Sequence, residues 1–565
     1  MGKITALTLI SLLLASLATL RVADAQPVAG PPNLVANGSF ETADDHGAPT
    51  GWIGETGNMK TVSFARDTEV KRTGAASGRI TIAPDDHPSW PAYAVKLAVQ
   101  PGQCYHVEAW VKTLDVGRLA YLAADYLDAN GNRVSFASGG AVNGTTTDWK
   151  QTLVAAQIPA GAVSMNVRLI LYGSGTAWFD DVTVVRDEAA ERALARMLEP
   201  LSAELVARGT TSVGDLSRLH RLFQAAANGG AYTVGIIGGS ITAGAAASSM
   251  DKHYSAYVVN WLKAHFPKAE WAFVNAGIGA TGTDYGCLRA QRDLLSKAPD
   301  LVVAEYAVND SNSQACAETY EGLLRQILVS AKQPPVLMLF MMNQGGGNAQ
   351  EWETKLGQHY GLPMLSYRDL LWPEIEAKRM TWADISPDAV HPHDVGHGYA
   401  GKLLTSLLDR ALASLPATPV PAPPQALPAP LLTDLYQFAH LSEAEALKPV
   451  ANTGWSYDAT NAWAKGWKAT TPGSVLEFGV TGEQLFLSFW RLRGPMGRAR
   501  VTIDGAQPSV QEAWFDQTWG GYRAMVKLPL GGPGQHRVRL ELLTEKSPES
   551  TGTEFRLLCL GTAGK

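Results

Sequence analysis

The sequence is poor in cysteine, with four among 565 residues. That density is far below the one found in disulfide scaffolds, so the fold must depend on hydrophobic cores. Cys287 and Cys316 lie in one predicted domain, where an exported chain could join them as a disulfide or keep two buried thiols. Cys104 and Cys559 lie in separate predicted domains.

Long apolar runs are also missing beyond the first 25 residues. No later stretch approaches the roughly 20 continuous apolar residues of a membrane-spanning helix, so we expect no membrane span. Met1 to Ala25 has one early lysine, an apolar stretch from Leu7 to Leu20, and Ala23-Asp-Ala25 before Gln26. This pattern is typical of a cleaved secretory signal, and it predicts a secreted protein of the periplasm or medium.

The charge pattern lacks a basic stripe. The formal net charge is −6, and lysine and arginine do not gather in one segment. A nucleic-acid partner is therefore not expected. The 16 tryptophans suggest carbohydrate instead, because indole rings stack on sugar faces, although most tryptophans serve to fill cores.

What is present divides into three predicted domains. Residues 27–186 alternate apolar and polar positions in short segments with turn signals, such as Tyr121 to Leu127 before Asp128-Ala-Asn130-Gly131, and predict a β-sandwich. Residues 433–565 alternate in the same way and predict a second sandwich. Between them, residues 416–432 form a proline-rich linker, for which we expect a semi-rigid spacer.

Residues 187–415 change to helical spacing and then to alternating strands and helices. Apolar strands are predicted before Ser240 and at 271–275, 301–305, 336–341 and 364–365, with helices at 254–266, 284–295, 318–332 and 396–412. Such βα units imply a parallel sheet covered by helices on both faces.

Ser240 follows the first of these strands. Its segment is Tyr232-Thr-Val-Gly-Ile-Ile-Gly-Gly-Ser240, in which a β-branched run breaks at Gly238-Gly239. Two glycines can adopt backbone angles closed to other residues. The serine is therefore expected at the carboxyl end of a strand, where open α/β sheets bind their ligands.

Three later segments contain candidate partners for this serine. They are Asn275-Ala-Gly-Ile-Gly-Ala280-Thr-Gly, Ala307-Val-Asn309-Asp310 and Asp388-Ala-Val-His391-Pro. With the Gly-Gly-Ser turn they resemble, in order, the four blocks of the SGNH (GDSL-like) hydrolases. This resemblance, together with the two sandwiches predicted above, implies a multidomain protein. Its central domain would be an α/β/α flavodoxin-like hydrolase with a parallel sheet of about five strands, flanked by two all-β domains of jelly-roll or sandwich type.

The resemblance also implies roles for the matching residues. Ser240 would be the nucleophile, His391 its base and Asp388 the carboxylate that holds the imidazole. The oxyanion would be bound by the backbone N–H of Ser240, the side-chain amide of Asn309 and the N–H of Ala280, with Gly279 as the alternative donor. No catalytic cofactor is implied.

The sequence departs from the family pattern at three positions. Ala280 stands where glycine is common, Ala307 replaces the first glycine of the third block, and Gly239 stands where the family name has aspartate. A backbone N–H survives the change at Ala280, so function is not excluded. The Gly239 variant resembles a subgroup of polysaccharide esterases.

The two flanking domains point towards sugars. Asn33-Leu-Val-Ala-Asn-Gly-Ser-Phe-Glu41 and Ala177-Trp-Phe-Asp-Asp181 resemble the first and last strands of jelly-roll carbohydrate-binding modules. In those modules such acidic residues often bind a structural calcium ion, so Glu41 and Asp181 are candidate ligands; the alternative is a solvated glutamate and a turn aspartate. In the second sandwich, tryptophans either bind glycan or pack as a brace, namely Trp455, Trp463 and Trp467.

Two other site types fit parts of the same sequence. Gly277-Ile-Gly-Ala-Thr-Gly282 matches a dinucleotide-binding G-x-G-x-x-G pattern, and Glu305 ends the next strand. That hypothesis leaves Ser240, Asn309 and the Asp388/His391 pair unexplained. A catalytic metal at His391-Pro-His-Asp-Val-Gly-His397 is a further hypothesis, although its spacing departs from the common metal-hydrolase pattern.

Taken together, the sequence predicts a secreted serine esterase that removes acetyl groups from a polysaccharide or oligosaccharide. Transfer of the same acetyl group to an acceptor sugar is an alternative, because both reactions share one acyl-serine. A glycan-binding protein with an inactive central domain is the alternative outside enzymology.

Overall fold

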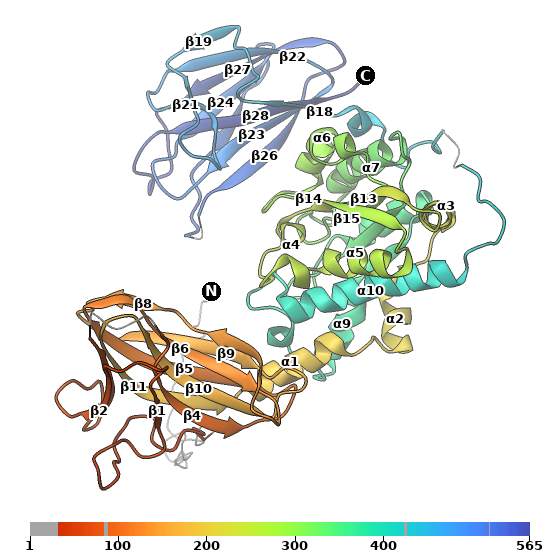
Figure 1. Ribbon diagram of the computed structural model, residues 1–565. Helices are drawn as coiled ribbons and strands as arrows, with labels where there is room; N and C mark the ends of the chain where they lie inside the picture. The colour runs from red at the N-terminus through yellow and green to blue at the C-terminus, as the bar shows by residue number, and fades with distance from the viewer. Residues whose placement is uncertain (1–31, 84–88, 423–425, 519) are drawn as a thin grey trace, which may run out of the picture. The chain divides into compact units, whose positions relative to one another are not determined.

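The computed structural model describes residues 32–83, 89–422, 426–518 and 520–565 (Figure 1). The chain forms two compact units, residues 1–195 and 196–565. The expected signal peptide at 1–25 lies outside the described residues. Among the helices in the described ranges, none is long and apolar enough to cross a membrane.

The first unit contains two facing antiparallel sheets. One has the order β1 (Ile53–Glu55), β4 (Ala92–Ala98), β10 (Ser164–Tyr172), β6 (Val116–Leu127) and β7 (Arg133–Ser138), with β8 (Val142–Gly144) paired to β6. The other has the order β2 (Val62–Asp67), β3 (Ser77–Ile82), β11 (Gly175–Arg186), β5 (Cys104–Leu114) and β9 (Lys150–Gln157).

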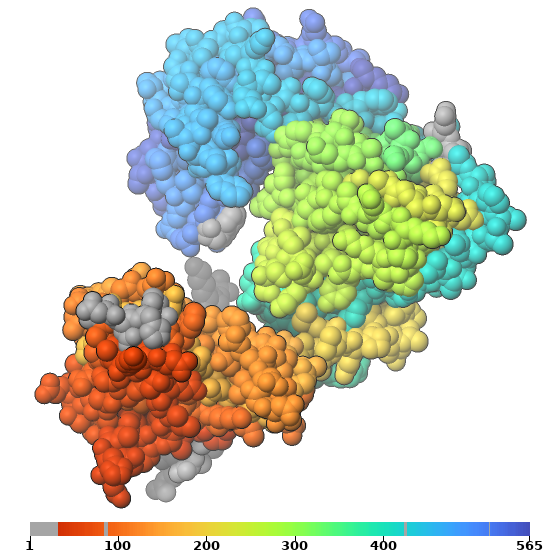
Figure 2. Space-filling view, in the orientation of Figure 1, coloured from red at the N-terminus to blue at the C-terminus, as the bar shows by residue number. Residues whose placement is uncertain are grey.

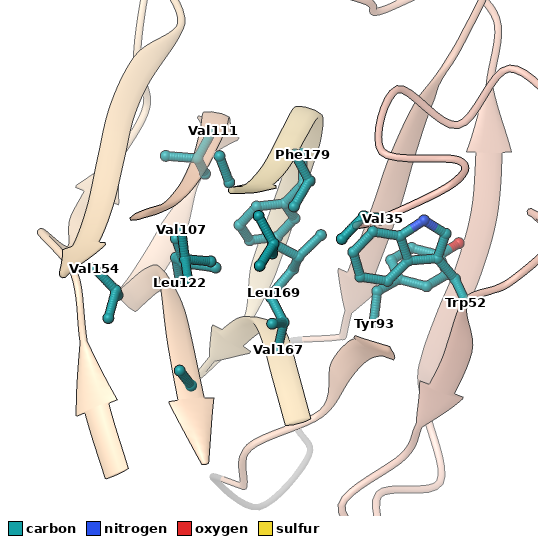
Figure 3. Packing of buried hydrophobic residues seen from close by; sticks show 14 of the residues in the cluster. Val35, Trp52, Tyr93, Val107, Val111, Leu122, Val154, Val167, Leu169 and Phe179 are labelled. Carbon is teal, nitrogen blue, oxygen red and sulfur yellow. The ribbon is translucent and has the colours of Figure 1, made fainter. Parts of the chain in front are cut away.

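Alternation along these strands produces the core between the sheets. Leu122 and Leu169 from the first sheet and Val107 and Phe179 from the second are fully buried together (Figure 3). Successive side chains of a strand point to opposite faces, so every second residue enters this core. Within the described residues of this region, the alternating segments are thus the strands of two sandwich-like sheets, as expected.

The second unit is centred on a six-stranded sheet. Its order is β12 (Thr210–Ser212), β17 (Met364–Ser366), β16 (Val336–Phe340), β15 (Leu301–Glu305), β13 (Gly230–Gly238) and β14 (Ala269–Gly277). The last five pair in parallel, and β12 pairs antiparallel with β17. Buried strands such as β15 and β16 are continuously apolar apart from Glu305, as expected for a sheet covered on both faces.

The sixth strand is a difference from the predicted sheet of about five. β12 is the three-residue segment Thr-Thr-Ser, whose residues are all only partly buried. Such a segment carries no hydrophobic period, so its pairing at the edge of the sheet could not be recognised from the pattern.

Helices cover both faces of this sheet. In Figure 1, α5 (Tyr254–His265) and α10 (Asp394–Ala413) lie on one face, and α6 (Thr283–Asp293) and α7 (Gln314–Leu328) lie on the other. The remaining helices of the second unit include α2 (Ala203–Gly209), α3 (Ser217–Ala226), α4 (Ser240–Ala243), α8 (Gln350–His359) and α9 (Tyr367–Glu376). The helix α1 (Glu188–Leu198) spans the boundary between the two units.

The C-terminal region is a second pair of antiparallel sheets. One has the order β20 (Ser456–Asp458), β21 (Gly466–Ala469), β28 (Phe555–Ala563), β23 (Gln484–Arg491) and β26 (Tyr522–Pro529), with β18 (His440–Glu443) paired to β28. The other has the order β19 (Ala451–Thr453), β22 (Val475–Thr481), β27 (Gln535–Leu542), β24 (Arg498–Ile503) and β25 (Ser509–Glu512).

This C-terminal sandwich packs against the α6 and α7 face of the central α/β domain (Figure 2). Phe486 and Cys559 of the sandwich are fully buried in the same apolar cluster as Leu288 of α6. A Cβ added to Gly561 would lie 2.5 Å from Leu288, so the strand backbone approaches the helix closely. The sandwich therefore completes the hydrophobic covering of these helices.

The proline-rich segment, for which a semi-rigid spacer was expected, is bound by helices at both of its described ends. In its described part, the carbonyl oxygens of Pro416 and Thr418 accept hydrogen bonds from Gln224 of α3. At its far end, the buried carboxylate of Glu321 accepts the backbone N–H groups of Leu431, Leu432 and Thr433. Hydrogen bonds from the helices therefore hold the described ends of the segment, which composition alone cannot show.

The cysteines carry no cross-link among the described residues. All four thiols are free, so Cys287 and Cys316 are not bridged; Cys287 is buried, whereas Cys316 is only half-buried. Cys287 is fully buried in α6, where its Sγ lies 3.4 Å from the carbonyl oxygen of Asp284.

Candidate active site

Ser240 is the first residue of α4, directly after β13 and Gly239. Close contacts explain the two glycines of this turn. A Cβ at Gly238 would lie 2.2 Å from Thr242 Oγ1, and a Cβ at Gly239 would lie 1.9 Å from Asn309 Oδ1. Glycine at position 239, where the family name has aspartate, thus leaves the space that the Asn309 amide occupies.

The three residues predicted to form a catalytic triad form one hydrogen-bonded chain. His391 Nε2 lies 2.8 Å from Ser240 Oγ, and His391 Nδ1 lies 2.9 Å from Asp388 Oδ2. An imidazole placed in this way can accept the serine proton, while the carboxylate stabilises the imidazolium that forms.

The loop that carries His391 is held by its own hydrogen bonds. Asp388 Oδ1 accepts the backbone N–H groups of Val390 and His391, each at 2.7 Å. Partial burial raises the pKa of Asp388, but the hydrogen bonds from His391 and Val390 outweigh it and lower the pKa below its usual value. Asp388 is therefore ionised at neutral pH, as its role beside an imidazole requires.

A second contact on this loop was not predicted. The Ser386 hydroxyl lies 2.8 Å from the carbonyl oxygen of Asp388 and 2.6 Å from that of His391. Ser386 is buried and bridges both ends of the Asp388–His391 segment. Its position depends on how the loop folds back, so no sequence motif reveals it.

The predicted oxyanion donors converge beside Ser240. A Cβ at Gly279 would lie 3.8 Å from Ser240 Cβ, and Asn309 packs against Gly239. Ala280 has φ 55°, a left-handed conformation that costs an alanine roughly 1–2 kcal/mol and a glycine almost nothing. This conformation explains why glycine is common at the position. Both Gly279 and Ala280 border the same cavity as Ser240.

This cavity has a volume of about 1270 Å³ and two walls. The hydrolase domain supplies Ser240, Asn309 and His391, and the C-terminal sandwich supplies Trp463 and Trp490 among others. Trp463 is 84% exposed, the largest exposed fraction among the large apolar side chains described in the chain. An aromatic ring left in solvent at the edge of a reactive site is a surface on which a sugar ring can stack.

The other two tryptophans raised by the sequence serve packing. Trp455 is buried in the sandwich core, with its ring 6.3 Å from that of Phe555. Trp467 packs against the same core and donates its Nε1–H to the carbonyl oxygen of Ala444. Of the three, only Trp463 borders the cavity. Trp490 also borders it, and the sequence analysis did not predict a role for this residue.

A charged cluster joins the two walls of the cavity. Glu443 of β18 accepts hydrogen bonds from Arg292 and Tyr285 of α6, and Arg523 of β26 lies within 3.9 Å of its carboxylate. All four residues border the cavity that contains Ser240. The cluster contains two guanidinium groups and one carboxylate, and Arg292 also pairs with Asp293; these contacts hold the sandwich beside the serine.

The dinucleotide hypothesis does not fit these positions. Glu305, which would have to bind a ribose, is fully buried, and its Oε2 accepts a hydrogen bond from Thr242 at 2.9 Å. Gly279 of the glycine pattern borders the serine cavity.

The histidine-rich segment after His391 has structural roles instead of metal ligation. His393 caps the start of α10 by accepting the Val395 N–H, and Asp394 binds Ser248 and Lys252. His397 is fully buried. In the described part of the chain, no group of three or more His, Cys, Asp or Glu side chains could hold a metal ion.

The two candidate calcium ligands of the first unit have protein partners. Glu41 accepts the backbone N–H of Ala75, and Asp181 accepts hydrogen bonds from Ser39, Thr73 and the guanidinium of Arg72. A neighbouring guanidinium opposes the binding of a cation. In this arrangement protein donors bind both Glu41 and Asp181, and a calcium ion at these carboxylates stays a prediction.

Comparisons with known proteins agree with this geometry. Residues 236–399 match the model of the GDSL-like Lipase/Acylhydrolase family. A solved two-domain esterase (CEX) active on acetylated mannans, crystallised with mannopentaose, is 30% identical; the match covers 64% of this chain and 98% of that one, with a TM-score of 0.59. A second structure of a two-domain esterase with the same printed activity is 29% identical, with the same coverage and TM-score.

This chain belongs to the GDSL-like lipase/acylhydrolase family. It is also similar to the CBM22-1 xylan-binding domain of Paenibacillus barcinonensis Xyn10C, at 17% identity over 28% of this chain and 96% of that one, with a TM-score of 0.23. That likeness is too distant to support an argument. No curated protein matches the sequence.

Proposed function

We propose that this protein is a secreted serine esterase that hydrolyses O-acetyl esters on a polysaccharide through an acyl-serine intermediate. One observation carries the proposal: Ser240 Oγ, His391 and Asp388 form a continuous hydrogen-bonded chain at the edge of a large cavity. Membership of an acylhydrolase family supports ester cleavage. Secretion rests on the signal-like residues 1–25.

In the first half of the reaction, Ser240 Oγ attacks the carbonyl carbon of the acetyl ester. His391 Nε2, 2.8 Å away, accepts the serine proton as the new C–O bond forms. The negative charge that develops on the carbonyl oxygen is met by the N–H groups of Ser240 and Ala280 and by the Asn309 amide. His391 then gives its proton to the leaving sugar oxygen, which leaves an acetyl group on Ser240.

In the second half, water takes the place of the sugar hydroxyl. His391 removes a proton from the water, which attacks the acetyl-serine, and the same donors bind the second oxyanion. The proton returns to Ser240 Oγ as acetate leaves, so the enzyme is regenerated. Transfer to a sugar would differ only in this half, where an acceptor hydroxyl would replace water.

The second wall of the cavity supports a polymeric substrate. Trp463 and Trp490 stand opposite the reactive serine on the C-terminal sandwich, and stacking on such rings suits a sugar chain. The related two-domain esterase acts on acetylated mannans, so acetylated mannan is the first substrate to test.

The first unit offers a separate aromatic surface. Trp90 is 51% exposed and stacks on Tyr172, with ring centroids 5.1 Å apart and planes 5° apart. We propose that this unit holds the enzyme on its polysaccharide. We also propose that the chain has three domains, at residues 27–186, 187–415 and 433–565.

The test is acetate release from a panel of acetylated polysaccharides, with mannan, xylan and pectin compared at equal acetyl content. The mature protein is expected to release acetate from at least one of them, and Ser240→Ala is expected to release none while keeping its thermal unfolding temperature. Equal release by the variant would overturn the proposal. Appearance of acetylated acceptor glycan instead of acetate would favour the transferase.

A further inference from the structure

Arg289 of α6 is the largest side chain in the structure that is fully buried. Its guanidinium donates hydrogen bonds to three neutral acceptors, which lie near the site. One terminal nitrogen donates to the carbonyl oxygen of Ala276 at 2.6 Å, and the other donates to the carbonyl oxygen of Gly238 at 3.1 Å and to the Tyr306 hydroxyl at 3.0 Å.

These three acceptors belong to three different segments. Gly238 ends β13, Ala276 lies near the end of β14, and Tyr306 directly follows β15. The strands are neighbours in the sheet, with β13 between the other two. Arg289 thus binds the carboxyl ends of three adjacent strands at once.

Each of these segments also delivers one proposed oxyanion donor. Ser240 comes two residues after Gly238, Ala280 four residues after Ala276, and Asn309 three residues after Tyr306. The third connection is short and direct, because the Asn309 N–H donates to the Tyr306 carbonyl oxygen at 2.9 Å. One guanidinium therefore connects the backbone supports of all three donors.

The surroundings are shaped around this contact. A Cβ at Gly286, one turn before Arg289 on α6, would lie 2.6 Å from the Tyr306 hydroxyl, so glycine leaves room for that group. Asp293 lies 3.2 Å from the guanidinium and compensates its charge. A planar fork of donors can reach several acceptors in fixed directions, which the ammonium group of lysine cannot do.

We propose that Arg289 is a positioning residue for the oxyanion hole, and this inference rests on the proposed esterase function. It does not touch the substrate. It fixes the spacing of the strand ends from which Ser240, Ala280 and Asn309 present their donors. Because those donors act on the transition state, misplacing them lowers kcat more than it weakens substrate binding.

The test compares Arg289→Lys with Arg325→Lys on a small aryl acetate. Arg325 of α7 is also buried, and it also donates to neutral acceptors, namely Gln437, Tyr360 and the Pro428 carbonyl oxygen, but none of these acceptors lies at the end of β13, β14 or β15. Arg289→Lys is expected to lower kcat by about 10²-fold with KM nearly unchanged. Arg325→Lys is expected to lose thermal stability while retaining kcat.

Affinity for a small alkyl boronic acid gives a second readout, because its tetrahedral adduct with Ser240 occupies the oxyanion hole. Arg289→Lys is expected to bind it about 10-fold or more weakly, whereas a merely structural role would leave the affinity of the folded fraction unchanged. Tyr306→Phe removes one acceptor and leaves the core apolar, so it serves if Arg289→Lys does not fold. It is expected to lower kcat by roughly 10-fold.

The outcomes separate this inference from the proposed function. If Ser240→Ala is inactive but Arg289→Lys and Tyr306→Phe keep wild-type kcat and boronate affinity, the positioning role is wrong and the esterase stands. If Ser240→Ala retains activity, the esterase proposal fails first. Equal kcat losses in Arg289→Lys and Arg325→Lys would mean that Arg289 acts only through stability.

Discussion

At the scale of single residues, Glu305 shows how burial sets the charge state beneath the nucleophile turn. Its side chain is fully buried, and Thr242 donates to its Oε2 at 2.9 Å. Burial raises the pKa of Glu305 to about 7, although the Thr242 hydrogen bond opposes this shift. The group therefore binds a proton in the folded state at pH values where the unfolded chain has released it.

This shift predicts how Glu305→Gln changes the pH dependence of stability. A carboxyl group with a raised pKa stabilises the fold at low pH, and this contribution is lost as the pH rises from about 4.5 to about 7. A glutamine at this position does not titrate, so the variant does not lose this contribution as the pH rises. The free energy of unfolding of the variant, relative to the wild type, should therefore increase by about 2 to 3 kcal/mol between pH 5 and pH 8. Urea unfolding at both pH values measures it, and parallel pH profiles would contradict the assignment.

Residues of the candidate site differ in how far the sequence could predict them. Ser240, Asn309, Asp388 and His391 stand in short motifs, and the structure brings all four to one cavity. Arg289 stands in no such motif. Its role depends on acceptors from three strands, so it becomes visible only once the strands are placed.

At the scale of elements, the turn between β13 and α4 depends on the segment after β15. Gly239 leaves the space occupied by the Asn309 amide, because a Cβ there would lie 1.9 Å from Asn309 Oδ1. The absence of a side chain at position 239 and the presence of Asn309 are therefore one feature of the site.

Gly239→Ala tests this coupling. The added methyl group should displace the Asn309 amide and cost roughly 10²- to 10³-fold in kcat, as much as Asn309→Ala, since both remove the same donor. The double variant should be little worse than either single variant, because the two changes act on one interaction. Steady-state kinetics on an aryl acetate measures the series. Full activity in Gly239→Ala, or multiplicative losses in the double variant, would show that the two positions act independently.

The hydrophobic pattern predicted the helices and strands wherever an element was long enough to bury one face in a core. β15 has the predicted bounds Leu301–Glu305, and α10 extends the predicted 396–412 by two residues at its start and one at its end. β12 was not predicted because three partly buried polar residues carry no period. The described ends of the proline-rich segment are bound by Gln224 and Glu321, which lie far from it in sequence.

At the scale of the second unit as a whole, the cavity belongs to two domains. Trp463 and Ser240 stand 223 positions apart in the chain and border the same space. Sequence alone left open whether the C-terminal sandwich braces the hydrolase or contacts a glycan. The shared core with α6 and α7 supports bracing, and the exposed Trp463 supports a role at the site.

Trp463→Ala is predicted to separate these roles. It should raise KM for acetylated polysaccharide by about 10-fold, because stacking on an aromatic ring contributes on the order of 1 kcal/mol or more, and leave turnover of a small aryl acetate unchanged. Tyr457→Ala is the matched control, since Tyr457 is an exposed aromatic residue of the same sandwich that does not border the cavity. Equal KM for polymer in wild type and Trp463→Ala would exclude stacking at this position.

The most direct measurement of the central claim is the site of covalent acetylation during turnover. Wild-type protein is mixed with excess aryl acetate, quenched in acid within the first turnovers, digested and mapped by mass spectrometry. We predict one acetyl group on the peptide that contains Ser240, and none on that peptide in Ser240→Ala. Rapid turnover without acetyl on Ser240, or with acetyl on another residue in both proteins, would contradict the account.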